Sequence, residues 1–301
     1  MTRPPRDMAA SIQARLRNVA KARGHDTQIV LTQFALERLL LRISTSPHGD
    51  QFLLKGALLF VAWTGLPHRA TRDLDLLGRG PAEEARLLAM FRSICTTEVE
   101  QDGITFDPQS VALSRIREDQ NYEGWRVTLL ATLGTARIDV QVDIGFGDHV
   151  HPAAQLMRLP PLLDLPTATI LAYPRDTVIA EKLEAMVSLG LLNSRMKDFF
   201  DLQFLASHFE FERTQLTTAV RGTFARRQTP LPTTLPIALD DAFAADAGKQ
   251  VQWRAFLRRT KLATDMSLAD VVAELRAFLW PVLTDATPSE KIWPAGGPWQ
   301  D

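Results

Sequence analysis

The spacing of apolar residues changes twice along this chain, and these changes limit the folds that it can adopt. Residues 8–22 and 28–43 carry apolar side chains at helical spacing. Apolar and polar side chains then alternate, as in strands with one buried face, over residues 73–77, 125–130 and 137–144. Helical spacing returns over residues 176–191, 197–208, 212–226, 251–259 and 267–283. This order predicts an α/β (α+β) protein with N-terminal helices, a sheet core and a helical C-terminal part.

Clusters of proline residues suggest where these parts meet. Five prolines lie between residues 152 and 174, and three more lie between residues 230 and 236. We interpret the first cluster as a packed linker that follows the core. We therefore expect a helical segment over residues 1–49, a core over 50–155, a helical domain over 156–285 and an irregular tail over 286–301.

Charge and cysteine content exclude several classes of protein. The 301 residues contain 34 Lys and Arg against 35 Asp and Glu, so nucleic-acid binding would need a local basic patch. Cys95 is the only cysteine, which excludes a disulfide framework and a cysteine zinc site. The most apolar stretch, residues 53–66, contains Lys55 and is too short to span a bilayer. No signal peptide is recognisable, so we expect a cytoplasmic protein without a membrane partner.

The segment Arg69-Ala-Thr71-Arg-Asp73-Leu-Asp75 is the first candidate for chemistry. Residues i and i+2 of a strand share a face, so Asp73 and Asp75 direct two carboxylates to one point. Such a pair suits Mg²⁺, which takes oxygen ligands and keeps part of its shell for phosphates. Arg69 and Thr71 add groups that can contact a polyphosphate. A lone Asp-x-Asp is more simply a surface strand, since on the order of one match is expected by chance.

A possible phosphate-binding turn lies upstream of this pair. Lys55-Gly56-Ala57 falls between an apolar strand and a helical run. A glycine at such a turn lets backbone N–H groups approach a phosphate, and the helix N-terminus favours the anion. An ordinary tight turn is the alternative for these residues taken alone.

A third carboxylate can come from the strand over residues 137–144. Alternation places Asp139, Gln141 and Asp143 on one face. If this strand lies beside that of Asp73, either aspartate can complete a site for two metal ions. Two such ions stabilise the attacking and leaving oxygens of an in-line displacement at phosphorus. We favour Asp143 because it is nearer the strand end, where glycines begin. The alternative is a half-exposed strand with a polar outer face.

Lys182 and Asp201 lie in two consecutive helical segments. If the two segments form an antiparallel hairpin, the positions of Lys182 and Asp201 along its axis differ by roughly 7 Å, at about 1.5 Å per residue. A lysine side chain can span this offset. Lys182 could then contact phosphates while Asp201 orients it, with Asp198 on the same face. An ion-paired helical hairpin without a ligand is the alternative.

Four motifs together resemble a known family over about residues 8–210. They are Lys55-Gly56-Ala57, Arg69-x-Thr71-x-Asp73-x-Asp75, Ala180-Glu-Lys182-Leu and Lys197-Asp198-x-x-Asp201-Leu. In this combination and order they look like the AbiEii/AbiGii toxin family of nucleotidyltransferases. The resemblance implies a nucleotidyltransferase-fold mixed sheet core followed by a helical domain.

The resemblance also implies a mechanism and partners. Asp73 and Asp75 would bind metal, Lys182 would contact the nucleotide and Asp201 would be essential. Better-known members are toxins of toxin–antitoxin or phage-defence systems, so a cognate antitoxin is a possible partner, and some add nucleotides to the 3′ end of tRNA. Ala57 departs from the Gly or Ser of many nucleotidyltransferases, which leaves phosphate contact to backbone N–H groups.

The leading hypothesis is a Mg²⁺-dependent enzyme that transfers NMP from an NTP to the 3′ end of an RNA, with tRNA as the favoured acceptor. One alternative is transfer to a small molecule or a protein hydroxyl, and another is a non-catalytic nucleotide-binding module. The candidates for a local phosphate patch are two basic clusters: Arg221 with Arg226 and Arg227, and Arg254 with Arg258, Arg259 and Lys261. The alternative for each cluster is an ordinary solvated helix face.

Overall fold

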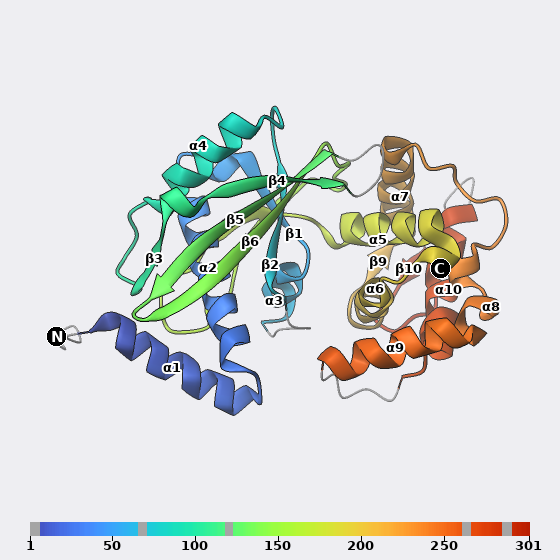
Figure 1. Ribbon diagram of the computed structural model, residues 1–301. Helices are drawn as coiled ribbons and strands as arrows, with labels where there is room; N and C mark the ends of the chain where they lie inside the picture. The colour runs from blue at the N-terminus through green and yellow to red at the C-terminus, as the bar shows by residue number, and fades with distance from the viewer. Residues whose placement is uncertain (1–6, 66–70, 118–122, 261–265, 285–290) are drawn as a thin grey trace. The chain divides into compact units, whose positions relative to one another are not determined.

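The computed structural model describes residues 7–65, 71–117, 123–260, 266–284 and 291–301 (Figure 1). The chain forms two compact units, each with its own internal packing. The first comprises Met1–Gly147 with Gln155–Ala172, and the second comprises Asp148–Ala154 with Tyr173–Asp301.

Two helices precede the sheet of the first unit, as the apolar spacing predicts. Helix α1 spans Met8–Arg23 and helix α2 spans Thr27–Thr45. Each helix has an aspartate at its N-cap, Asp7 for α1 and Asp26 for α2. The carboxylate of each accepts a hydrogen bond from a backbone N–H of the first turn. Helix α2 is buried along most of its length because it packs against the sheet and against α1 and α4 (Glu84–Cys95).

The sheet of the first unit is mixed, as predicted. Its strands are β1 (Phe52–Lys55), β2 (Asp73–Gly78), β3 (Ile104–Phe106), β4 (Ala112–Arg117), β5 (Glu123–Leu133), β6 (Ala136–Phe146), β7 (Gln155–Arg158) and β8 (Thr169–Ala172). The order is β3-β5-β6-β2-β1-β8-β7, with β4 also paired to β5. The β2–β6 and β1–β8 pairs are parallel and the others antiparallel. Helix α3 (Leu58–Thr64) follows β1.

Strands β7 and β8 lie in the stretch that we interpret from sequence as a linker, and that interpretation missed them. The two strands pair antiparallel, and β8 extends the sheet by pairing with β1. Pro160, Pro161 and Pro166 fall between the two strands, where no ladder hydrogen bond is needed from their nitrogens. The proline spacing therefore marks a connection within the sheet.

The second unit is mainly helical. It contains α5 (Arg175–Leu189), α6 (Met196–His208), α7 (Arg213–Arg227), α8 (Asp241–Ala245), α9 (Ala247–Thr260) and α10 (Leu268–Thr284). Buried aromatic residues of α6, α8, α9 and α10 form much of its core. Strand β10 (Ile292–Trp293) pairs with β9 (Phe211–Glu212), so part of the expected irregular tail is ordered. Among the described helices, none combines the length and apolar character needed to cross a membrane.

Candidate active site

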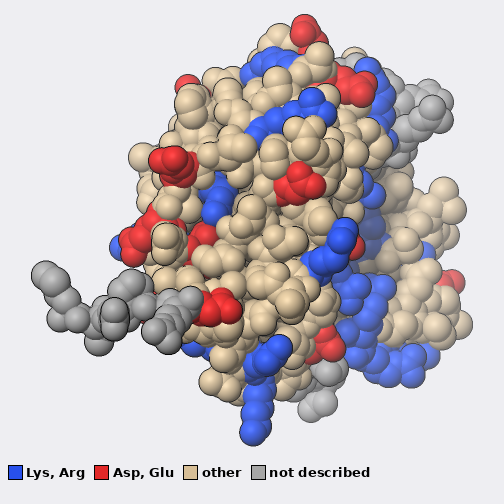
Figure 2. All heavy atoms as spheres, turned by 60° about the vertical axis from the view of Figure 1, so that its left-hand side comes forward, with Lys and Arg blue, Asp and Glu red and all other residues tan. Residues whose placement is uncertain are grey.

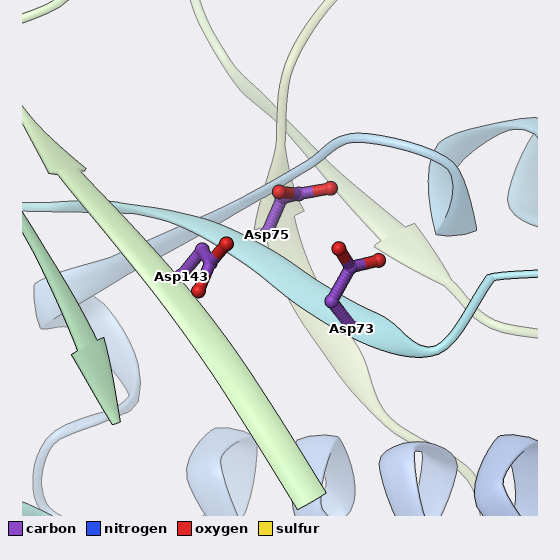
Figure 3. A group of neighbouring side chains, drawn as sticks. All are labelled: Asp73, Asp75 and Asp143. Carbon is purple, nitrogen blue, oxygen red and sulfur yellow. The ribbon is translucent and has the colours of Figure 1, made fainter. Parts of the chain in front are cut away.

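Strands β2 and β6 bring three aspartates together. They pair in parallel with Asp75 opposite Asp143. One carboxylate oxygen from each of Asp73, Asp75 and Asp143 lies within 4.8 Å of the others. Figure 3 shows the three carboxyl groups gathered on one side of the two strands. The alternation that predicts this convergence also buries Leu74, whose side chain has no exposed surface.

The third carboxylate is that of Asp143. Of the two residues that the sequence leaves open, Asp143 is partly buried and joins the group, whereas Asp139 is exposed and lies outside it. The strand pairing explains the difference, because β2 begins at Asp73, opposite Gln141 of β6. Asp139 precedes that point and instead lies opposite Leu130 of β5.

The turn at Gly56 packs directly against Asp75. Gly56 has φ +73°, in the left-handed region that favours glycine. A Cβ atom at this position would lie 1.9 Å from Asp75 Oδ2. Lys55, just before the turn, pairs with Asp75 in the β1–β2 ladder. Ala57 directly precedes α3 and forms no side-chain cap hydrogen bond, and the predicted phosphate contact of this turn stays a prediction.

Thr71 orients Asp73. Its side chain is buried, and its hydroxyl donates a hydrogen bond of 2.6 Å to Asp73 Oδ1. The contact holds the first carboxylate of the group in place, and the predicted phosphate contact of Thr71 stays a prediction. Arg69, the other residue predicted upstream, lies outside the described residues.

The sequence assigns no role to two residues that bind the Asp143 carboxylate, although alternation places Gln141 on the face of Asp143. Arg126 donates through Nε and Nη2 to the two oxygens of Asp143, at 2.9 and 2.8 Å. Gln141 donates to the same carboxylate at 3.2 and 3.3 Å. Arg126 lies on β5 directly opposite Asp143. Arg126 also falls in an alternating segment, but a single sequence does not reveal which residue of a neighbouring strand it faces.

The donor set of this group fits Mg²⁺. Three carboxylates offer the hard oxygen ligands that Mg²⁺ prefers. Arg126 forms an ion pair with Asp143, and a divalent cation beside the group would offset further negative charge. The Asp75 carboxylate packs directly on the bare Cα of Gly56, where a side chain would collide with it.

Lys182 lies in the second unit, in an ion-paired cluster between α5 and α6. Its Nζ is 2.6 Å from Asp198 Oδ1 and 2.9 Å from Asp201 Oδ2. Both aspartates are fully buried. Burial alone would raise the pKa of Asp198, but the charges of Lys182 and Arg195 outweigh it and hold the pKa below its usual value. The expected hairpin contact is present, and the predicted nucleotide contact of Lys182 stays a prediction.

Comparison with known proteins adds to this geometry. A family model described as nucleotidyl transferase AbiEii toxin, type IV toxin–antitoxin system, matches residues 38–278. The solved structure of JHP933 from Helicobacter pylori is similar with a TM-score of 0.50 and 15% identity, covering 85% of this chain and 92% of that one. A second H. pylori structure, a candidate nucleotidyltransferase, has a TM-score of 0.49 and 15% identity, with 85% and 95% covered. No curated protein matches the chain. The likeness to JHP933 concerns the fold, and it agrees with the predicted mixed sheet core.

Proposed function

Because this chain belongs to the AbiEii family of nucleotidyl transferase toxins, we propose that it transfers NMP from an NTP to the 3′ end of an RNA. In this proposal tRNA is the acceptor, Mg²⁺ is the cofactor and pyrophosphate is released. The observation that supports it best is the convergence of Asp73, Asp75 and Asp143. The type IV toxin–antitoxin context implies a cognate antitoxin as partner.

In the proposed reaction the 3′ hydroxyl oxygen of the acceptor bonds to the α-phosphorus of the NTP. The bond from that phosphorus to the bridging oxygen breaks, and the hydroxyl proton is released. Mg²⁺ held by the three aspartates would offset the charge of the triphosphate and of the leaving group. The chain's own residues position the reactants and stabilise charge, which are the main sources of catalysis in such a transfer.

Each neighbour of the aspartates has a defined part in this proposal. Thr71 fixes the direction of Asp73, and Arg126 fixes that of Asp143. Gly56 lets the turn lie against Asp75, because only a residue without a Cβ fits beside that carboxylate. We retain Lys182 as the proposed nucleotide contact, with Asp201 and Asp198 as the residues that orient its ammonium group.

The test uses two matched substitutions on β6. Purified protein is incubated with MgCl₂, total tRNA and each α-labelled NTP in turn, for the wild type, Asp143→Asn and Asp139→Asn. We expect label in tRNA for the wild type and for Asp139→Asn. Asp143→Asn should lose at least about 100-fold in rate, the order seen when one stabilising group of a transition state is removed. Equal activity of the two variants would contradict the role of Asp143.

The same experiment tests the acceptor and the metal. Label in a protein or a small molecule, without label in RNA, would overturn the RNA acceptor. NTP binding without transfer to any of these acceptors would overturn the catalytic proposal. Chelation by EDTA should abolish transfer and added MgCl₂ should restore it, so transfer that survives EDTA would contradict the metal dependence.

A further inference from the structure

The two basic clusters of the second unit differ in how their charges are compensated. On α7, Arg227 lies 2.7 Å from Glu184 Oε2, 3.8 Å from Glu181 Oε1 and 3.9 Å from Asp148 Oδ1. Arg221 and Arg226 also interact with other groups of the protein. The α7 arginines therefore contribute to the packing and charge balance of the fold.

Among the described residues, the arginines of α9 have no such partners. Arg254, Arg258 and Arg259 are exposed, and among the described residues none forms a hydrogen bond or ion pair with them. Helix α9 contains no acidic residue. Lys261, the fourth member of this predicted cluster, lies outside the described residues.

The packing of α9 places these arginines on one face. Lys249, Trp253 and Phe256 are buried, and Phe256 packs on Phe200 of α6 with ring centroids 5.7 Å apart. Five exposed residues from the second turn onward follow at helical spacing on the opposite side: Val251, Arg254, Ala255, Arg258 and Arg259. We call these five residues the α9 arginine face.

The chemistry of this face matches a phosphate backbone. Arg254 and Arg258 are one turn apart, at a rise of about 6 Å along the helix. Each guanidinium can donate two parallel hydrogen bonds to a phosphate. Ala255, the residue after Arg254, adds only a small side chain to this face. Figure 2 shows acidic and basic side chains interspersed over the front of one face, with basic side chains gathered at its lower right. With three exposed arginines and no acidic residue in the helix, the α9 arginine face is a local concentration of positive charge.

We propose that the α9 arginine face binds the sugar–phosphate backbone of the RNA acceptor. This inference rests on the proposed function, because that function supplies a polyanionic substrate to a protein whose net charge is only −1. Arg258 and Arg259 also lie in the last turn of α9, where positive charge stabilises a helix. The experiment therefore has to separate RNA binding from helix stability.

The test measures salt-dependent tRNA binding of the full-length protein by fluorescence anisotropy, without NTP, between 50 and 200 mM KCl. The test variant changes Arg254, Arg258 and Arg259 to Gln. Its matched control is Arg226→Gln, which changes an exposed arginine in the last turn of α7. We expect the slope of log affinity against log salt to fall by about 2–3 in the triple variant, since each lost phosphate contact removes about 0.7–0.9. Affinity at 50 mM should fall at least about 10-fold, while the control keeps the wild-type slope.

A second triple variant, with the same three arginines changed to Lys, separates charge from structure. Lysine still neutralises phosphates, so the salt slope should remain within about one unit of the wild type. Equal loss of slope in the Gln and Lys variants would overturn the proposal, because the loss would then not follow charge. An unchanged slope and affinity in the Gln variant would overturn it as well.

Two further outcomes separate this inference from the proposed function. If the wild type transfers nucleotides to tRNA while the Gln variant binds tRNA normally, the function stands and the RNA surface is refuted. If no transfer occurs but tRNA binding depends on the α9 arginine face, the surface stands and the function fails. Loss of polyglutamate binding in the Gln variant, with tRNA binding intact, would assign the face to an acidic protein partner and refute the proposal.

Discussion

Replacing Gly56 with alanine tests whether the turn against Asp75 is needed for both folding and activity. The backbone at Gly56 has φ +73°, which an L-residue occupies at a cost of about 1–2 kcal/mol. The new Cβ would also lie 1.9 Å from Oδ2, 2.6 Å from Cγ and 2.7 Å from Cβ of Asp75. Rotation of the Asp75 side chain can relieve the first two contacts. The contact with Cβ requires the backbones of β1 and β2 to move.

The magnitude follows from these two effects. Overpacking of this kind adds about 1–3 kcal/mol, so the total loss of stability is about 2–5 kcal/mol. Gly24 offers a matched control, because it has φ +63° and a Cβ added there would meet no atom of another segment within 4 Å. Gly24→Ala should therefore lose about 1–2 kcal/mol from the backbone alone. A displacement of about 1 Å at Asp75 should lower kcat/KM about 100-fold, while Gly24→Ala should leave kcat/KM unchanged.

The assay combines thermal unfolding with labelled-NTP transfer for the wild type and both variants. For a unit of this size, 1 kcal/mol shifts the unfolding midpoint by about 2–4 °C. We expect Gly56→Ala to unfold below Gly24→Ala and to lose activity at temperatures where it is fully folded. Equal kcat/KM for the two alanine variants would refute the argument that the backbone at Gly56 must remain bare for Asp75 to work.

Two other substitutions probe charges that the structure pairs. Arg126→Gln should lower the unfolding midpoint in EDTA by the equivalent of about 1 kcal/mol. Added MgCl₂ should then raise the midpoint of the variant more than that of the wild type. Equal Mg²⁺-induced shifts of the two midpoints would contradict this role of Arg126. Lys182→Ala leaves Asp198 and Asp201 buried without their lysine and should cost about 3–5 kcal/mol, against almost no loss for the exposed Lys197→Ala. Because the folded-state pKa of Asp198 lies below its usual 3.8, wild-type stability from this pair is present above about pH 4 and is lost as the pH falls further. Acid titration of the unfolding midpoint should show a smaller decline in Lys182→Ala.

The sequence predicts the aspartate group because its constraints are local. Alternation along β2 puts Asp73 and Asp75 on the face opposite Leu74, and the same rule applied to β6 leaves only two residues to choose between. The choice of Asp143 then depends on where β2 begins relative to β6, which the structure supplies through the Asp75–Asp143 pairing.

The parts that the sequence missed depend on contacts between distant segments. Arg126 faces Asp143 only because β5 and β6 form a hairpin in one register; a shift of one residue would turn its side chain to the apolar face. Arg42 is similar: it lies in the apolar pattern of α2, yet it is buried because Asp102, 60 residues away, pairs with it at 2.8 Å. A helical pattern predicts which face is buried, but it does not identify the partner that makes a buried charge tolerable.

The contrast between α7 and α9 was also not predictable from the sequence, because it depends on contacts between distant segments. Their sequences are alike in having several arginines and no acidic residue. Arg227 pairs with Glu184 of α5 and lies near Asp148, which follows β6, and no spacing within α7 reveals these acids. Unpaired charge favours binding of an external polyanion, and for the α9 arginines it is recognised only by comparison with the other described residues. The Gln and Lys variants of α9 test that property directly, because they change charge and hydrogen-bonding geometry separately.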